Sequence, residues 1–176
     1  MTPLEFGRLI LEGDPQFRRV PAGMVDALVS AALVDGAALA RTMPERDPRR
    51  LAERFGLAVA EESAPGDFAR TIVFADYRPG RITLYRAALD HLSMLAGFEV
   101  TPIFLAHELY HHLDQARAEP LVRRHRIAIL GPWTTGLACL AEIAAGAFAQ
   151  ELLGLAEHPK GLDLTAQEAW RKTSSS

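Results

Sequence analysis

The chain has 176 residues, of which 49% are apolar and 23% are charged, and this length suits one domain with a sizeable hydrophobic core. Its formal net charge of −3 and its short arginine runs exclude a strongly basic surface, so we expect no direct contact with nucleic acid. The single cysteine, Cys139, cannot form an internal disulfide, and no window reaches the roughly 18 unbroken apolar residues of a membrane helix. The N-terminus also lacks the pattern of a secretory leader, so we expect a cytoplasmic protein with no membrane association.

The first part of the chain predicts helices. Residues 3–12 and 21–42 place apolar side chains at three- and four-residue intervals, which is typical of helices that bury one face. A shorter helix is predicted over residues 48–55, with Asp47 as its N-cap and Pro48 at its first position.

The middle of the chain predicts a small sheet. Residues 57–63 resemble a short strand, and residues 70–77 and 81–85 are rich in β-branched and aromatic side chains. The Pro-Gly pair at 79–80 has turn chemistry, so the last two strands should form a hairpin. A further helix is predicted over residues 87–96.

Two longer helices are predicted in the last part of the chain. The first covers residues 101–118, with Thr101 as its cap and Pro102 at its first position. Residues 121–130 are ambiguous between strand and loop, and a long apolar helix should follow over 134–154 after a Gly-Pro break. Because strands and helices are segregated along the chain, we predict an α+β fold that is mostly helical, with its small sheet beside the helix of residues 101–118.

We expect three sections along the chain. Residues 1–45 should form a helical segment packed on the core, residues 46–155 the core itself, and residues 156–176 a partly flexible tail that ends in serines.

The sequence His-Glu-Leu-Tyr-His at residues 107–111 is the most informative motif. Positions four apart lie on one face of a helix, so His107 and His111 can direct two imidazoles at one metal ion. Glu108 lies next to the first ligand and can reach a metal-bound water as a general base without binding the metal itself. Ordinary helices also carry such a pattern by chance, but this one lies in a capped, partly apolar helix, which favours a metal site.

A zinc site of this kind needs a third protein ligand. Asp114 lies on the same helix but on a different heading, so we expect Asp114 and His112 to act as supporting or surface groups. Glu142 is the stronger candidate, because it is the only acid between Glu119 and Glu151 and lies in an apolar part of the helix predicted over 134–154. An unpaired buried carboxylate is costly, so this side chain must either face solvent or meet a cation such as Zn²⁺.

Residues 142–153, EIAAGAFAQELL, resemble the E-x-x-A-N-x-F-A-x-E-L-L signature that follows HExxH in the ImmA/IrrE-type metallopeptidases. The resemblance covers about residues 47–155 and implies a zincin-like, specifically gluzincin-like, fold. It also implies a zinc ion held by His107, His111 and Glu142. Gly146 replaces the asparagine of the signature, and Gly-Leu-Ala replaces the L-M-P that usually closes it. Many relatives carry a helix-turn-helix domain, but residues 1–45 show no such pattern.

A peptidase also needs a polar group that stabilises the charge on the attacked carbonyl oxygen. The candidates are Tyr85, Tyr110, His112 and His125. A strand tyrosine such as Tyr85 is more often a packed core side chain than a catalyst. If residues 81–85 form an edge strand beside the metal helix, their backbone could align a peptide by β-augmentation.

We therefore expect a zinc metallopeptidase whose substrate is a protein or peptide, in particular a regulatory protein. The competing hypothesis is a non-catalytic zinc-binding module that binds a transcriptional regulator or another protein partner. An intact HExxH motif is compatible with both. A third alternative is a metal-free helical protein in which Glu142 lies far from His107.

Overall fold

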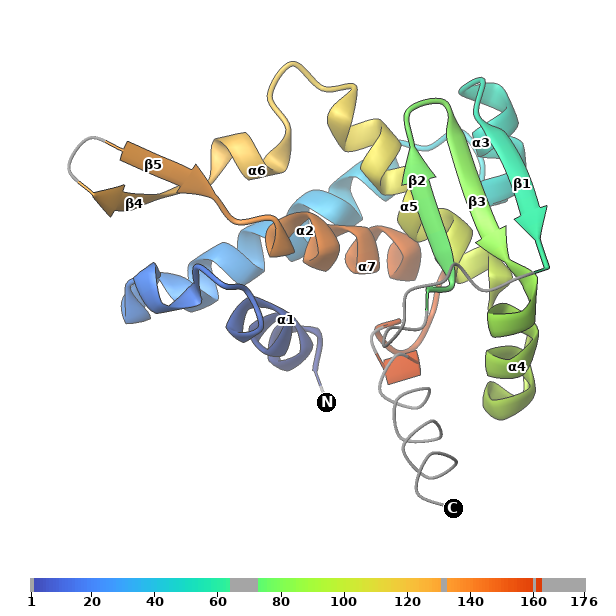
Figure 1. Cartoon of the computed structure of the whole chain (residues 1–176), viewed down its shortest axis with the longest axis horizontal. Helices are drawn as coiled ribbons and strands as arrows, with labels where there is room; N and C mark the ends of the chain where they lie inside the picture. The colour runs from blue at the N-terminus through green and yellow to red at the C-terminus, as the bar shows by residue number, and fades with distance from the viewer. Residues whose placement is uncertain (1, 64–72, 131–132, 160, 163–176) are drawn as a thin grey trace.

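The computed structural model describes residues 2–63, 73–130, 133–159 and 161–162, which form an α+β fold with a helical majority, as predicted (Figure 1). In chain order the elements are α1 (Pro3–Glu12), η1 (Phe17–Arg19), η2 (Ala22–Met24), α2 (Val25–Arg41), α3 (Pro48–Arg54), β1 (Ala58–Glu62), β2 (Ala75–Arg78), β3 (Arg81–Tyr85), α4 (Arg86–Ala96), α5 (Thr101–Gln115), α6 (Leu121–Arg124), β4 (Arg126–Leu130), β5 (Trp133–Gly136) and α7 (Cys139–Leu153).

Helix α7 lies at the centre of the helical layer, with α1, α2 and α5 packed around it. Its sequence is apolar on almost every side, and ten of its residues are buried, which is typical of a central core helix. The α2 and α7 backbones approach most closely at Gly36. A Cβ at this position would overlap the carbonyl oxygen of Ala144 and would lie 3.0 Å from the backbone nitrogen of Phe148. Glycine is therefore required for this helix crossing.

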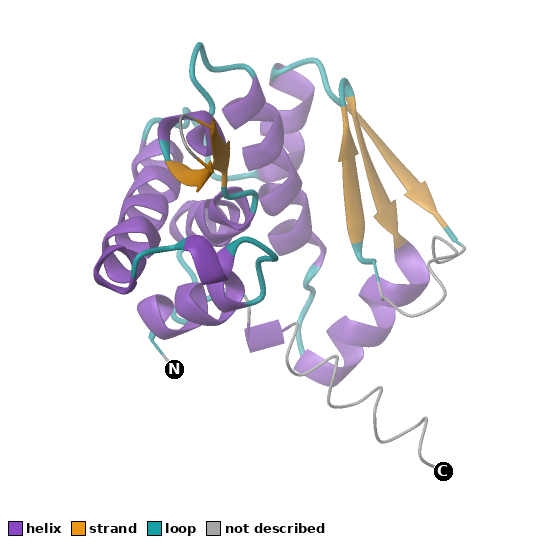
Figure 2. Ribbon diagram, turned by 60° about the vertical axis from the view of Figure 1, so that its left-hand side comes forward, coloured by secondary structure: helices purple, strands orange, loops and turns teal. Residues whose placement is uncertain are grey.

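The three-stranded sheet flanks the helical layer on one side (Figure 2). Its strand order is β1-β3-β2: β1 pairs with β3 in parallel, and β2 pairs with β3 antiparallel through a turn whose Gly80 has φ of 83°. The predicted hairpin is therefore present, but residues 81–85 form the central strand. Since both sides of β3 are paired, the expectation that these residues form an edge is wrong. The edge strand next to α5 is β2.

Two helix starts differ from the prediction. Thr101 is the first residue of α5 and not its cap, because the Glu99 carboxylate accepts the Thr101 backbone N–H at 3.0 Å. The helix predicted over 134–154 begins only at Cys139. Its first residues form β5 instead, paired antiparallel with β4, so the ambiguous segment 121–130 divides into α6 and β4. The β-branched Thr134 and Thr135 suit this strand pairing.

Some predicted features fall outside the described residues: the start of the hairpin at 70–72, the break at 131–132 and the tail from 163 onward. The described part of the tail packs on the core. The His158 ring is 4% exposed and stacks on Phe6 with ring centroids 5.5 Å apart. It also covers Gly146, where a Cβ would come within 2.7 Å of the ring. Here the imidazole takes the space that a larger residue at position 146 would need.

The segment Ala22–Arg41 is long and apolar enough to cross a membrane when judged by length and composition alone. Core helices of soluble proteins and signal sequences meet the same criterion, so it assigns no membrane to this chain. In the structure this segment contacts α1 and α7.

The α2–α7 crossing yields a stability prediction. Gly36→Ala should lower the free energy of unfolding by about 1–3 kcal/mol, because the new methyl group must push two packed backbones apart. Urea unfolding followed by circular dichroism measures the change. Gly23→Ala is the matched control, since a Cβ there meets nothing within 4 Å. Equal stability of the two variants would contradict the close approach.

Candidate metal centre

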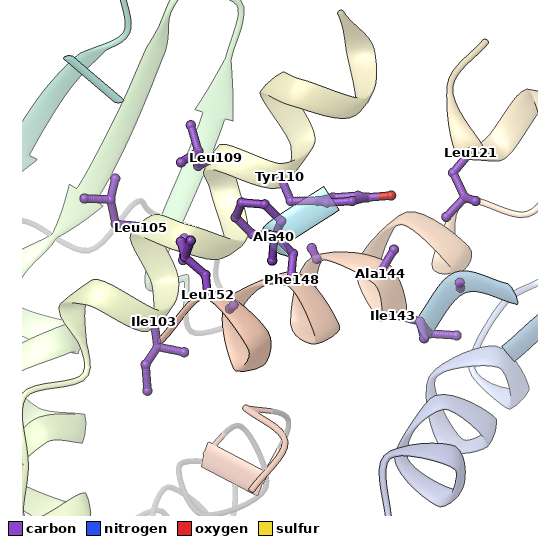
Figure 3. Packing of buried hydrophobic residues seen from close by; sticks show 14 of the residues in the cluster. Ala40, Ile103, Leu105, Leu109, Tyr110, Leu121, Ile143, Ala144, Phe148 and Leu152 are labelled. Atoms are coloured by element: carbon purple, nitrogen blue, oxygen red, sulfur yellow. The ribbon is translucent and has the colours of Figure 1, made fainter. Parts of the chain in front are cut away.

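Helices α5 and α7 are held face to face by large buried side chains. The ring of Tyr110 on α5 packs against the ring of Phe148 on α7 with centroids 5.9 Å apart, and both side chains are fully buried (Figure 3). Burial of side chains of this size stabilises a fold by about 1.5–3 kcal/mol each. The apolar packing therefore fixes the relative position of the polar residues that the two helices carry.

The metal-binding candidates converge across this helix pair. Nε2 of His107 lies 3.1 Å from Oε2 of Glu142, and Nε2 of His111 lies 3.3 Å from Oε1 of the same carboxylate. One ligand atom from each of the three residues lies within 4.8 Å of the others, so the group can hold a metal ion. The i, i+4 spacing aligns the two imidazoles, and Glu142 reaches them from the first turn of α7, where the helix dipole favours a negative charge.

The two histidines stabilise the ionised form of Glu142. The Glu142 side chain is 52% exposed, yet the protein atoms around its carboxyl oppose ionisation; hydrogen bonds from His107 and His111 outweigh that effect and hold its pKa well below the usual range. Glu142 is therefore a carboxylate at neutral pH, the form that binds a metal cation.

Glu108 lies beside the cluster but is not part of it. Burial is the main cause that raises the pKa of its carboxyl; the positive charges of His107 and His111 oppose this rise, while Glu142 and Asp76 add to it. The carboxyl faces a pocket of about 310 Å³. The pocket is lined by Ala75, Asp76, Tyr77, Glu108, His111, Gln115 and Glu142.

The partner of His112 is a residue of strand β2. Nδ1 of His112 lies 3.2 Å from the hydroxyl of Tyr77, and its ring also contacts Phe55. Burial lowers the pKa of His112. The imidazole of His112 therefore links helix α5 to the edge strand β2. Tyr77 was missed by the sequence analysis, because only the register of β2 brings it to this place.

Asp114 has a structural position. It is 4% exposed and accepts the backbone N–H of Leu121 at 3.0 and 3.2 Å, which satisfies the start of α6. Its Oδ1 also lies 3.5 Å from Nη1 of Arg117. Asp114 is therefore buried and does not belong to the cluster of His107, His111 and Glu142.

The other candidates for stabilising a carbonyl oxygen lie away from the pocket. Tyr85 is 7% exposed and precedes α4, while His125 follows α6, and neither lines the pocket. The hydroxyl of Tyr110 donates to Asp35 at 3.0 Å. Burial, together with nearby Asp114 and Asp35, raises the pKa of Tyr110 far above its ordinary value.

Asp35 is a structural residue that the sequence analysis missed. Its carboxylate accepts hydrogen bonds from Tyr110, from Arg117 at 2.8 Å and from Arg124 at 2.7 Å, so it ties α2 to both α5 and α6. Its side chain is only 13% exposed. Burial raises its pKa, but the two guanidinium groups outweigh that effect and lower the pKa below 3.8. The available signal was the same as for Glu142: an acid within an apolar helix.

No protein-family model, curated protein or solved structure matches this chain in the comparisons made. The features that bear on function are therefore the pocket and the cluster formed by His107, His111 and Glu142.

Asp35 yields a prediction for stability against pH. Asp35→Asn should cost about 2–3 kcal/mol at pH 7, less than a fully buried pair because both arginines remain partly exposed. Because the native pKa is lowered, the contribution is complete above the unfolded pKa of about 3.9 and is lost as pH falls through the native pKa. Chemical unfolding of both proteins between pH 7 and pH 3 should show the difference shrinking at the acid end. A difference that grows on acidification would contradict this account.

The metal centre yields a binding prediction. Glu142→Ala should weaken zinc affinity by more than about 100-fold, since it removes a ligand, whereas loss of an outer partner alone costs about 10–100-fold. Competition with a chromophoric chelator measures the affinity. Glu151→Ala is the matched control on the same helix, since Glu151 pairs with Arg41 and should not affect binding. Equal affinities of the two variants would remove Glu142 from the site.

Proposed function

We propose that this protein is a zinc metallopeptidase with a zincin-like catalytic arrangement. His107, His111 and Glu142 are the zinc ligands, and Glu108 is the general base. The observation that carries the proposal is the convergence of these three side chains, from two helices, next to a carboxyl with a raised pKa in an open pocket. The resemblance of residues 142–153 to the ImmA/IrrE-type signature supports the same assignment.

Zinc suits this set of donors. Two imidazole nitrogens and one carboxylate are a common ligand set of catalytic zinc, which leaves a fourth position open for water or substrate. When bound, zinc polarises a carbonyl group and lowers the pKa of water at the open position. His111 and Glu142 also help to line the pocket, so a metal held by the cluster would lie beside it.

Glu108 handles the protons of the reaction. It can accept the proton of the attacking water and return it to the leaving amine, as a general base and then a general acid. Burial favours the protonated form of Glu108 and raises its pKa, which favours return of the proton to the leaving group. Glu108 follows the proposed ligand His107 on α5 and lines the pocket, but it is not itself a proposed metal ligand.

The edge strand β2 provides the place for an extended substrate. Tyr85 N–H donates to the carbonyl of Phe74 at 3.0 Å, so Phe74 and, two residues on, Asp76 direct their main-chain groups at β3. Ala75 and Tyr77 therefore direct theirs to the outer edge, where no other strand among the described residues pairs with β2. A peptide could add to this edge beside the zinc site by β-augmentation. In this proposal β2, and not residues 81–85, aligns the peptide.

The second candidate function is a regulatory module that holds zinc and binds a transcriptional regulator without cleaving it. The exposed edge of β2 would serve such a partner equally well. The two functions differ in their dependence on Glu108: hydrolysis requires its carboxylate, whereas binding of metal and partner does not.

The general base yields the decisive activity prediction. Glu108→Gln should bind zinc like the unchanged protein but hydrolyse peptides about 10²–10⁴-fold more slowly, because the amide cannot accept the proton. The assay uses unfolded casein and a mixture of fluorescence-quenched peptides, with zinc content determined for each sample. Full activity of Glu108→Gln would exclude this base. Absence of cleavage by the zinc-loaded, unchanged protein on any of these substrates would favour the regulatory module.

A further inference from the structure

We propose that the pocket beside the metal centre accepts an extended peptide whose lysine or arginine side chain lies opposite Asp76. The inference rests on the proposed function, since it names the substrate class of the same site. It places charge recognition on strand β2 and not on the metal ligands.

The register of the sheet places Asp76 where cross-strand side chains are closest. Asp76 faces Thr83 in β3 and directs its main-chain N–H and C=O groups towards that strand. If a peptide strand is added antiparallel to the outer edge of β2, Asp76 and the peptide residue opposite it therefore form a non-hydrogen-bonded pair. In such positions the Cα atoms of facing residues are about 4.5 Å apart, closer than in hydrogen-bonded pairs. The substrate residue opposite Asp76 thus has its side chain beside the carboxylate.

The charge of the pocket favours a cation at this point. Asp76, Glu108 and Glu142 all line it, and none of the described lining residues is lysine or arginine. A bound zinc ion would offset the charge of its ligand Glu142, whereas Asp76 would keep its own. Asp76 is close enough to Glu108 for its charge to contribute to the raised pKa of that carboxyl. A glutamate or aspartate in the substrate strand would face a like charge across the strands, which is unfavourable.

The present partner of Asp76 shows the kind of group that its carboxylate accepts. Nε of Arg78 donates to Oδ2 of Asp76 at 3.0 Å, and the Arg78 side chain is 77% exposed. Such exposed ion pairs contribute little to stability, because solvent screens them and both side chains lose conformational freedom. A substrate guanidinium or ammonium group held in place by main-chain pairing can therefore replace Arg78.

The test measures peptide binding in the absence of cleavage. Zinc-loaded Glu108→Gln protein is titrated with three short fluorescein-labelled peptides that differ only in one residue: lysine, glutamine or glutamate. The varied residue is moved through the peptide to find the position that faces Asp76. At that position lysine should bind about 3- to 10-fold more tightly than glutamate, as expected for one cross-strand charge pair. The ratio should fall as salt is raised, because exposed charges are screened.

Variants of Asp76 then assign the preference to this side chain. In the Glu108→Gln background, Asp76→Asn should remove most of the preference, and Asp76→Lys should reverse it. Asp90→Asn is the matched control, because Asp90 is an exposed acid on α4 that pairs with Arg86. Zinc content and thermal unfolding confirm that each variant is folded, and the isosteric Asp76→Asn decides the outcome if Asp76→Lys does not fold.

The outcomes separate this inference from the proposed function. No lysine preference at any position, or a preference that survives Asp76→Asn, would overturn the role of Asp76, even if the unchanged protein cleaves peptides. A preference that depends on Asp76 in a protein that cleaves none of them would support the charge recognition and contradict the peptidase.

Discussion

A carboxylate on an apolar helix needs a compensating cation or polar partner, and this constraint organises the centre of the molecule. Glu142 extends from α7, whose remaining side chains are almost all committed to the core. Its partners are the two imidazoles that α5 presents one turn apart. Apolar packing between α5 and α7 fixes the distance between the helices, and this distance sets the positions of His107, His111 and Glu142 relative to one another. Metal binding would then require little rearrangement of the backbone.

A second carboxylate, Asp35, follows the same rule in the helical layer. Asp35 reaches from α2 to Tyr110 on α5, to Arg117 just after that helix and to Arg124 on α6. This cluster ties α2 to α5 and α6, while Gly36 next to it allows α2 and α7 to touch through their backbones. The two neighbouring positions thus fix α5 and α7 relative to α2. Rigid support of this kind is what a metal site needs to hold its ligands in one geometry.

Local signals predicted most helices, because caps, prolines and apolar periodicity act within a few residues of one another. Asp47 does cap α3, and the helix predicted over 87–96 does end at Ala96, where Gly97 follows in a left-handed conformation. The errors came from non-local pairing. Residues 133–136 form a strand only because β4 lies beside them, and β3 is central only because β1 pairs with its second side. The edge position of Tyr77 and Asp76 could not be known before that pairing. Glu142 was predicted because an acid stands out in an apolar helix; in the structure its side chain is 52% exposed and lies beside both histidines. Asp35 carries the same signal, but the reasoning was not applied to it.

The central claim is that His107, His111 and Glu142 bind one zinc ion. Its most direct test is a crystal structure of the zinc-loaded protein, with anomalous diffraction recorded on both sides of the zinc absorption edge. The account predicts one anomalous peak between α5 and α7, about 2.0–2.2 Å from Nε2 of both histidines and from a carboxylate oxygen of Glu142. A zinc-loaded crystal with no peak there, or with a peak that Glu142 does not contact, would contradict it.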